Sequence, residues 1–166
     1  SIGSATEPIV HRQIAEGHSV CMHTFHHDYH RLYPGRSGNA DAIVADHAWV
    51  LDRTRDVLGE DFFAHCYRYP GGHLSWQNLA PADRALAAQQ VHWLDWNANS
   101  YDASTRMPGT EEEFVAAVID DWVEEGSPNV MVVLMHDAAP KKLTAAALPA
   151  LIRELRSKGF SFATLD

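Results

Sequence analysis

The sequence is poor in cysteine and in basic residues, and both shortages exclude classes of protein. Its two cysteines, Cys21 and Cys66, are too few for the disulfide framework of a small secreted scaffold and lack zinc-finger spacing. Thirteen Lys and Arg stand against twenty-two Asp and Glu, which gives a formal net charge of -9. Because this charge repels phosphate backbones and anionic membrane surfaces, we predict no nucleic-acid partner.

Long apolar runs and repeats are also absent. No stretch approaches the roughly 20 apolar residues of a membrane helix. The opening residues, Ser1 to Glu7, have neither the charged nor the apolar region of a signal peptide. Without repeats, low-complexity runs or linker-like composition, residues 1–166 are predicted to form one domain with no membrane span, and any targeting segment is expected upstream.

What the sequence does contain is an alternation of short apolar segments and amphipathic helices, which predicts an α/β fold. Helices are expected over residues 7–16, 40–58, 110–126 and 145–158, and strands over 19–24, 65–69, 91–97, 130–135 and 160–165. In the second helix, Asn39 is the expected N-cap and His47 falls on the apolar face. Pro149 is expected to be tolerated only in a first helical turn. This pattern alone leaves open whether the sheet is an open one or an incomplete barrel.

Polar motifs follow the first two predicted strands. The segment His23-Thr-Phe-His-His27 carries two imidazoles four residues apart, which can reach one metal ion if the backbone turns helically; a histidine-rich surface loop is the alternative. The segment Arg68-Tyr-Pro-Gly-Gly72 has glycines that let backbone N–H groups approach an oxyanion; the alternative is an ordinary turn with Arg68 in a surface ion pair.

Two further motifs follow the next strands. Asp95 lies inside the apolar segment Trp93-Leu-Asp-Trp-Asn97, where an unpaired charge is costly, so it needs Arg68 or a histidine as a partner. His136 lies in Leu134-Met-His-Asp137, at the carboxyl end of an apolar strand, where α/β folds gather their active-site groups.

In this order, the four motifs resemble motifs two to five of the polysaccharide deacetylases of the NodB-homology type, carbohydrate esterase family 4, in their bacterial peptidoglycan-deacetylase form. Residues 148–166 also resemble the final helix and strand of that family. The resemblance implies a distorted (β/α) barrel. The first family motif, Thr-Phe-Asp-Asp, is not in the sequence, and residues 1–7 resemble the segment after the family's second strand, so an N-terminal strand–helix–strand unit is expected to be missing.

The resemblance also implies a reaction, the hydrolysis of a linear amide at a divalent metal, most commonly Zn²⁺, with Co²⁺ or another divalent ion as alternatives. His23 and His27 match the family's metal-binding histidines, and the missing motif holds its aspartates. Arg68 would orient the catalytic base, the N–H of Gly71 would bind the oxyanion, and His136 would protonate the leaving amine. Leu134 would line the pocket for the acetate methyl group.

The fourth motif departs from the family pattern. Asn99 stands where many members have an aspartate that pairs with the acid histidine, and Ala103 where they have a tryptophan. Asp95 is therefore our first candidate for the carboxylate partner of His136, and Asp102 is the second. Aromatic side chains are candidates for the sugar-facing wall of a groove, namely Tyr69, Trp76 and Trp96.

Cys21 and Cys66 each precede a motif residue by two positions, so strand alternation places both inside the fold on neighbouring strands. We expect them to lie close together and, of the two possible states, favour free thiols over a disulfide.

The predicted function is removal of N-acetyl groups from a β-linked amino-sugar polymer, with peptidoglycan favoured over chitin and xylan, in an extracellular or cell-envelope protein. One alternative is a catalytically inactive carbohydrate- or metal-binding domain. Another is a different metallohydrolase whose missing ligand is Asp28, Asp102 or Asp137.

Overall fold

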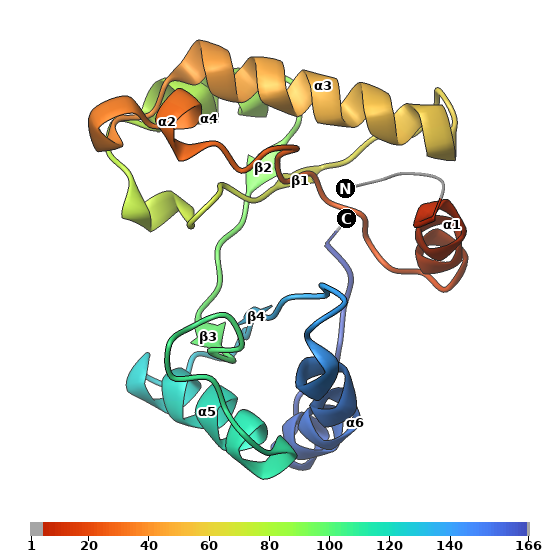
Figure 1. Cartoon of the computed structure of the whole chain (residues 1–166), viewed down its shortest axis with the longest axis vertical. Helices are drawn as coiled ribbons and strands as arrows, with labels where there is room; N and C mark the ends of the chain where they lie inside the picture. The colour runs from red at the N-terminus through yellow and green to blue at the C-terminus, as the bar shows by residue number, and fades with distance from the viewer. Residues whose placement is uncertain (1–4, 166) are drawn as a thin grey trace. The chain divides into compact units, whose positions relative to one another are not determined.

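The computed structural model describes residues 5–165, so most of the segment 1–7 discussed above lies outside the described residues. The chain divides into two compact units, Ser1–Asp95 with Thr164–Asp166, and Trp96–Ala163 (Figure 1). Each unit has its own cluster of buried apolar side chains. The α/β class is confirmed, while the assignment of residues 1–166 to one domain stays a prediction.

The first unit is built on a two-stranded parallel sheet, β1 (Cys66–Tyr67) with β2 (His92–Trp93). The predicted strand 19–24 is wrong, because only Met22 pairs there, in an isolated bridge with Tyr67. The helices of the first unit are α1 (Glu7–Ala15), α2 (Tyr29–Leu32), α3 (Ala40–Leu58) and α4 (Ala80–Ala87), with short 3₁₀ turns η1 (Pro34–Arg36) and η2 (His73–Ser75).

Helix α3 is the main support of this unit and forms over the predicted residues. Asn39 caps it by accepting the N–H of Ala42 at 3.2 Å, and the chain leaves it through Gly59 at φ 98°. Its apolar face, with Ile43 and Leu51, joins the buried cluster of Tyr67 and Tyr69. A helix that buries one face in this way holds the β1 strand and the motif that follows it.

A disulfide joins Cys21 to Cys66, with their Cα atoms 5.0 Å apart. The prediction that the two cysteines are neighbours is confirmed, and the preference for free thiols is wrong. Strand alternation identified the proximity but carries no information on oxidation. The disulfide ties the segment before His23 to the strand before Arg68.

The second unit pairs β3 (Ala98–Asn99) with β4 (Val133–Leu134) in parallel and packs them with α5 (Glu111–Glu124) and α6 (Lys142–Ser157). The Thr110 hydroxyl accepts the N–H of Glu113 at 3.1 Å, which confirms the predicted helix start. Helix α6 begins three residues earlier than predicted and continues through Pro149, which is exposed. Packing of the opposite face of α6 on α5 sustains the helix despite the missing N–H donor.

Two further predicted strands are mostly or wholly wrong. The run 130–135 forms a strand only at Val133–Leu134, where both residues are half-buried, and Val130 is 71% exposed. The stretch 160–165 forms no strand. Apolar composition favours a strand at both places, but a strand also needs a neighbouring strand to pair with. Within residues 5–165, no helix combines the length and apolar character that crossing a membrane requires.

Candidate active site

The two predicted metal ligands lie together in the first unit. The imidazole centroids of His23 and His27 are 5.1 Å apart, and both side chains are exposed. His27 has a left-handed backbone conformation, φ 54°, and its N–H donates to the Thr24 hydroxyl at 3.2 Å. This turn, rather than a helix, brings the second imidazole next to the first.

The His23 ring is oriented in the way that suits a metal ligand. Its Nδ1 lies 2.6 Å from the carbonyl oxygen of Arg68, a contact that requires the proton on Nδ1 and leaves the lone pair on Nε2. Metal-bound histidines are commonly fixed by such a bond from their other ring nitrogen. The two imidazoles therefore fit a divalent metal as part of a ligand set.

A complete set is not found among the described residues: no group of three or more His, Cys, Asp or Glu side chains in residues 5–165 is placed to hold a metal ion. The Asp28 carboxylate instead caps α2, accepting the N–H groups of His30 at 3.0 Å and Arg31 at 3.2 Å. The alternative in which Asp28 completes the ligand set is thus not supported.

Arg68 directly follows strand β1 and is half-buried. Its Nε donates to the Leu94 carbonyl oxygen at 3.2 Å. Burial lowers the pKa of the Arg68 guanidinium, and the nearby Asp95 carboxylate opposes that shift. An arginine stays protonated in either case, so this position keeps its positive charge.

The turn after Arg68 presents a backbone donor. Gly71 has φ 77° and is exposed, and within residues 5–165 its N–H donates no hydrogen bond. A Cβ at this position would lie 3.2 Å from both the Trp76 ring and the Tyr29 hydroxyl, in a backbone conformation that side chains rarely adopt. Only glycine therefore fits at this position, and the role of its N–H in binding an oxyanion stays a prediction.

Asp95 does not have the role that we predicted for it. Its Oδ1 accepts the N–H of His73 at 3.0 Å and its Oδ2 accepts the N–H of Leu74 at 3.2 Å. The prediction that Asp95 pairs with His136 is wrong, because the strand ends at Trp93 and the Asp95 side chain accepts hydrogen bonds from the first turn of η2 instead.

The carboxylate partner of His136 is Asp102, our second candidate. In the second unit, Nδ1 of His136 donates to Oδ1 of Asp102 at 2.7 Å, and the His136 backbone N–H donates to Oδ2 at 2.8 Å. The Asp102 side chain is 5% exposed and that of His136 is 44% exposed. A buried carboxylate thus orients an imidazole whose other nitrogen, Nε2, is the one able to exchange a proton with a substrate.

Two residues that the sequence analysis missed complete this pair. The Thr144 hydroxyl donates to Asp102 Oδ2 at 2.9 Å, and the Lys141 ammonium donates to the Asp102 carbonyl oxygen. Burial alone would raise the pKa of the Asp102 carboxyl, but the hydrogen bonds from His136 and Thr144 outweigh it and lower the pKa below its usual range. Asp102 therefore stays ionised, and its carboxylate oxygens are already engaged, which disfavours a role as metal ligand.

Asn99, the departure from the family pattern, forms the turn before Asp102. Its side-chain oxygen accepts the N–H of Tyr101 at 2.8 Å, and its own N–H donates to Asp121 on α5 at 2.8 Å. Tyr101 has φ 56° and its hydroxyl donates to the same Asp121 carboxylate. No motif signal marked Asp121, because its partners come from a different element.

The aromatic candidates have different environments. Tyr69 is fully buried and donates its hydroxyl to Asp83 at 2.9 Å, so the prediction that it faces a sugar is wrong. Trp76 is half-buried and stacks on Tyr33 with centroids 4.1 Å apart, and the Arg36 guanidinium lies 5.6 Å from its ring. The assignments of Trp76 and of Leu134, half-buried on β4, to substrate contacts stay predictions.

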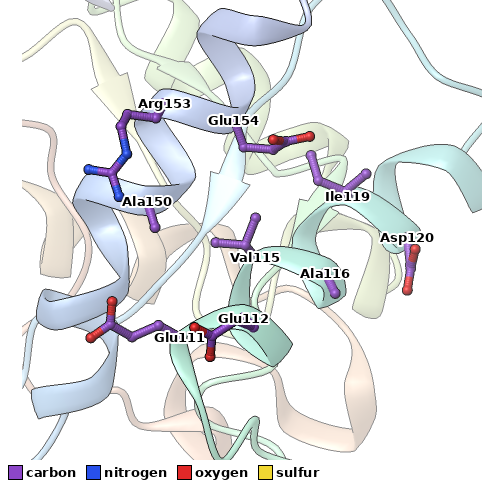
Figure 2. A pocket seen from close by; sticks show the side chains of 9 residues that line it. All are labelled: Glu111, Glu112, Val115, Ala116, Ile119, Asp120, Ala150, Arg153 and Glu154. Atoms are coloured by element: carbon purple, nitrogen blue, oxygen red, sulfur yellow. The ribbon is translucent and has the colours of Figure 1, made fainter.

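A groove between α5 and α6 contains none of these motif residues (Figure 2). Its lining is Glu111, Glu112, Val115, Ala116, Ile119, Asp120, Ala150, Arg153 and Glu154. With four carboxylates, one guanidinium and no histidine, it offers no acid–base pair comparable to Asp102 and His136.

Comparisons with known proteins agree with the family resemblance. No family model matches the chain. A peptidoglycan-N-acetylglucosamine deacetylase of Bacillus cereus is 26% identical over 156 residues, covering 93% of this chain and 52% of the relative, so the chain spans about half the length of that protein. The catalytic domain of such a deacetylase from Eubacterium rectale shares the fold, with a TM-score of 0.76, 24% identity, and coverage of 98% of this chain and 71% of that one.

A solved CE4 esterase structure from Streptococcus mutans gives the strongest of these likenesses. It superposes with a TM-score of 0.95 at 42% identity, over 99% of this chain and 70% of that chain. The chain therefore belongs to the carbohydrate esterase family 4 polysaccharide deacetylases.

Proposed function

We propose that the protein is a metal-dependent deacetylase that hydrolyses N-acetyl groups on a β-linked amino-sugar polymer. The observation that carries this proposal is the Asp102–His136 pair, a buried, ionised carboxylate bonded to an exposed imidazole. Amide hydrolysis requires protonation of the leaving amine, and an oriented histidine is the usual donor.

In the proposed reaction His136 acts as the general acid. With Nδ1 bonded to Asp102, the imidazolium delivers its Nε2 proton to the amine as the carbon–nitrogen bond breaks. Asp102 does not change protonation state; it holds the ring and stabilises the cation, since its pKa is lowered. Thr144 keeps the carboxylate from rotating by occupying Oδ2.

The first unit supplies groups that bind developing negative charge. The Gly71 N–H is exposed, which suits donation to the tetrahedral oxyanion, and the Arg68 guanidinium supplies a fixed positive charge. By the family pattern Arg68 orients the catalytic base, an aspartate of the motif that this sequence does not contain.

His23 and His27 would hold the divalent metal, for which we propose Zn²⁺. Zn²⁺ polarises an acyl oxygen and lowers the pKa of water. The Arg68 carbonyl fixes the His23 tautomer that this role needs. Two imidazoles are fewer than the protein ligands that zinc sites use, so these residues are part of the set.

We propose peptidoglycan as the polymer, with chitin-type oligosaccharides second, because relatives that match most of this chain are peptidoglycan-N-acetylglucosamine deacetylases. Trp76, backed by Tyr33, offers a ring for stacking on a sugar. The Cys21–Cys66 disulfide supports an extracellular or cell-envelope location, because disulfides persist in oxidising compartments.

The test is acetate release from N-acetylated peptidoglycan fragments and chitin oligosaccharides by the purified full-length protein, with its metal content measured in parallel. We expect acetate release that a chelator abolishes and Zn²⁺ restores, and metal loss in His23→Ala and His27→Ala. Stoichiometric metal retention by both variants would refute the metal assignment. Saccharide binding without acetate release under any metal condition would favour the inactive binding domain.

A further inference from the structure

The turn that carries Gly71 has one backbone hydrogen bond of its own, from the Gly72 N–H to the Tyr69 carbonyl oxygen at 2.9 Å. Gly71 and Gly72 both have positive φ, 77° and 84°, in a segment that runs from β1 to η2. Two consecutive glycines are free to sample many backbone conformations, so an N–H aimed by such a turn needs anchoring from outside it. Contacts on both sides of the pair provide that anchoring.

Asp95 anchors the downstream side. Its two carboxylate oxygens accept the N–H groups of His73 and Leu74, at 3.0 and 3.2 Å, which are the first residues after the glycine pair. Hydrogen bonds from backbone N–H groups to an ionised carboxylate are stronger than those between neutral groups. Asp95 reaches this position from the segment just after β2.

Asp83 on α4 anchors both sides at once. Its Oδ1 accepts the hydroxyl of the fully buried Tyr69 at 2.9 Å, and its Oδ2 lies 2.9 Å from Nε2 of His73. The His73 ring also stacks on Trp93, with centroids 3.8 Å apart and planes at 11°. Tyr69 and His73 flank the glycine pair, so one carboxylate fixes the distance between the two ends of the turn.

Two bonds inside the segment complete the arrangement. The Ser75 hydroxyl donates to the Gly71 carbonyl oxygen at 2.7 Å, and Trp76 Nε1 donates to the Pro70 carbonyl oxygen at 2.7 Å. These two bonds hold the carbonyl groups of Pro70 and Gly71, which lie on either side of the Gly71 nitrogen. The direction of the Gly71 N–H is therefore set by the positions of η2 and Tyr69.

We propose that Asp95 and Asp83 are positioning residues that aim the Gly71 N–H at the oxyanion. Asp83 acts through His73 and Tyr69. This inference rests on the proposed deacetylase function. Neither carboxylate touches the substrate; each acts through the backbone of the turn. Because the oxyanion exists only in the transition state, misdirecting its donor lowers kcat and leaves substrate binding unchanged.

The experiment compares Asp95→Ala and Asp83→Ala with conservative variants in the full-length protein. We expect Asp95→Ala to lower kcat for acetate release about 10- to 100-fold, less than the loss of an oxyanion donor, with KM within about twofold of wild type. Asp83→Asn should recover most of the activity lost in Asp83→Ala, because its amide can accept from Tyr69 and donate to His73. Asp56→Ala, at an exposed carboxylate paired with Arg53, is the matched control and should keep wild-type kcat.

Amide hydrogen exchange gives a readout that does not depend on turnover. Asp95→Ala should exchange the His73 and Leu74 amides faster than wild type, while the helix α3 amides keep their protection. An active wild type with unchanged kcat in Asp95→Ala, or a change in KM alone, would overturn the positioning role and leave the proposed function standing. A wild type that releases no acetate with any metal would overturn the proposed function itself, whatever the exchange data show.

Discussion

The buried Asp102 carboxylate of the second unit and several buried polar groups of the first unit differ in whether they have hydrogen-bond partners. In the second unit, the buried Asp102 carboxylate is fully engaged by His136 and Thr144. In the first unit, several buried side-chain atoms have no hydrogen-bond partner among the described residues: Tyr33 OH, Tyr67 OH, Asp46 Oδ2 and both ring nitrogens of His47. Satisfied groups fix a geometry, whereas buried groups without partners reduce stability.

The difference appears again in the pKa values. Burial raises the pKa of the Asp46 carboxyl and lowers that of the His47 imidazole, so both are shifted toward their neutral forms. The pKa of Asp102 is shifted the other way, toward its ionised form, because its partners outweigh burial. We therefore expect substitution of His136 to act mainly on catalysis, and substitution of the buried Asp46 or His47 to act mainly on stability and its pH dependence.

The largest effect should follow from removing the acid in the second unit. His136→Ala should lower kcat for acetate release by about 10²- to 10⁴-fold, the usual contribution of a positioned general acid. Because His136→Ala also leaves Oδ1 of the buried Asp102 without its donor, the free energy of unfolding should fall as well, so kcat is measured well below the unfolding midpoint of the variant. His11→Ala, at an exposed histidine on α1, is the control and should leave kcat unchanged. Equal losses in both variants would refute the assignment.

The second largest effect should come from the disulfide of the first unit. Replacing both Cys21 and Cys66 with serine should lower the free energy of unfolding by about 2–4 kcal/mol, because the crosslink restricts the unfolded chain. Denaturant unfolding followed by a signal from the first unit measures the loss. Reductant should lower the stability of the wild type but not that of the double variant. Insensitivity of the wild type to reductant would contradict a bonded pair.

A smaller effect should follow from loosening Asp102. Thr144→Val removes a buried hydrogen bond and should cost about 1–2 kcal/mol. It should also raise the Asp102 pKa toward its ordinary value of 3.8, since one bond to the carboxylate is lost. The ionised Asp102 contributes stability, and this contribution is lost as pH falls through the pKa of Asp102 in the folded state. Because the variant has the higher pKa, it should lose this stability at a higher pH than wild type.

Acid unfolding curves of the wild type and Thr144→Val measure that shift. Thr105→Val, at an exposed threonine of the same unit, is the matched control and should follow the wild-type curve. Coincident curves for all three proteins would mean that Thr144 does not act on the carboxylate.

The parts of the fold that sequence predicted best are those set by local signals. Helix 40–58 was bounded correctly because Asn39 and Gly59 mark its ends through side-chain capping and a positive φ. Strands were overestimated, because apolar runs such as 130–135 do not reveal which segments pair. Helix α4 was missed, although Pro81 in its first turn was a usable signal.

Among the residues of the candidate site, too, local sequence signals identified some and missed others. Motif order identified His23, His27, Arg68, Gly71 and His136 as candidates, but the choice between Asp95 and Asp102 depended on how the chain turns after β2 and β3. The contributions of Asp83, Thr144 and Asp121 come from helices distant in sequence, and no local pattern marks them. Likewise, the apolar face of α3 predicted that His47 is buried but not that its ring has no partner.

The smallest effect should come from that histidine. His47 is 1% exposed, packs edge-on against the Tyr67 ring at 5.7 Å, and has a pKa lowered by burial from its ordinary 6.5. The unfolded chain therefore binds a proton that the folded chain does not, and wild-type stability should fall as pH drops below about 6.5. His47→Leu should abolish this slope and, by removing two unpartnered nitrogens, change stability at neutral pH by only about 1 kcal/mol. The raised pKa of the neighbouring Asp46 gives stability the opposite pH dependence, so Asp46→Asn should leave the loss of stability below pH 6.5 in place. Persistence of that loss in His47→Leu would refute its assignment to His47.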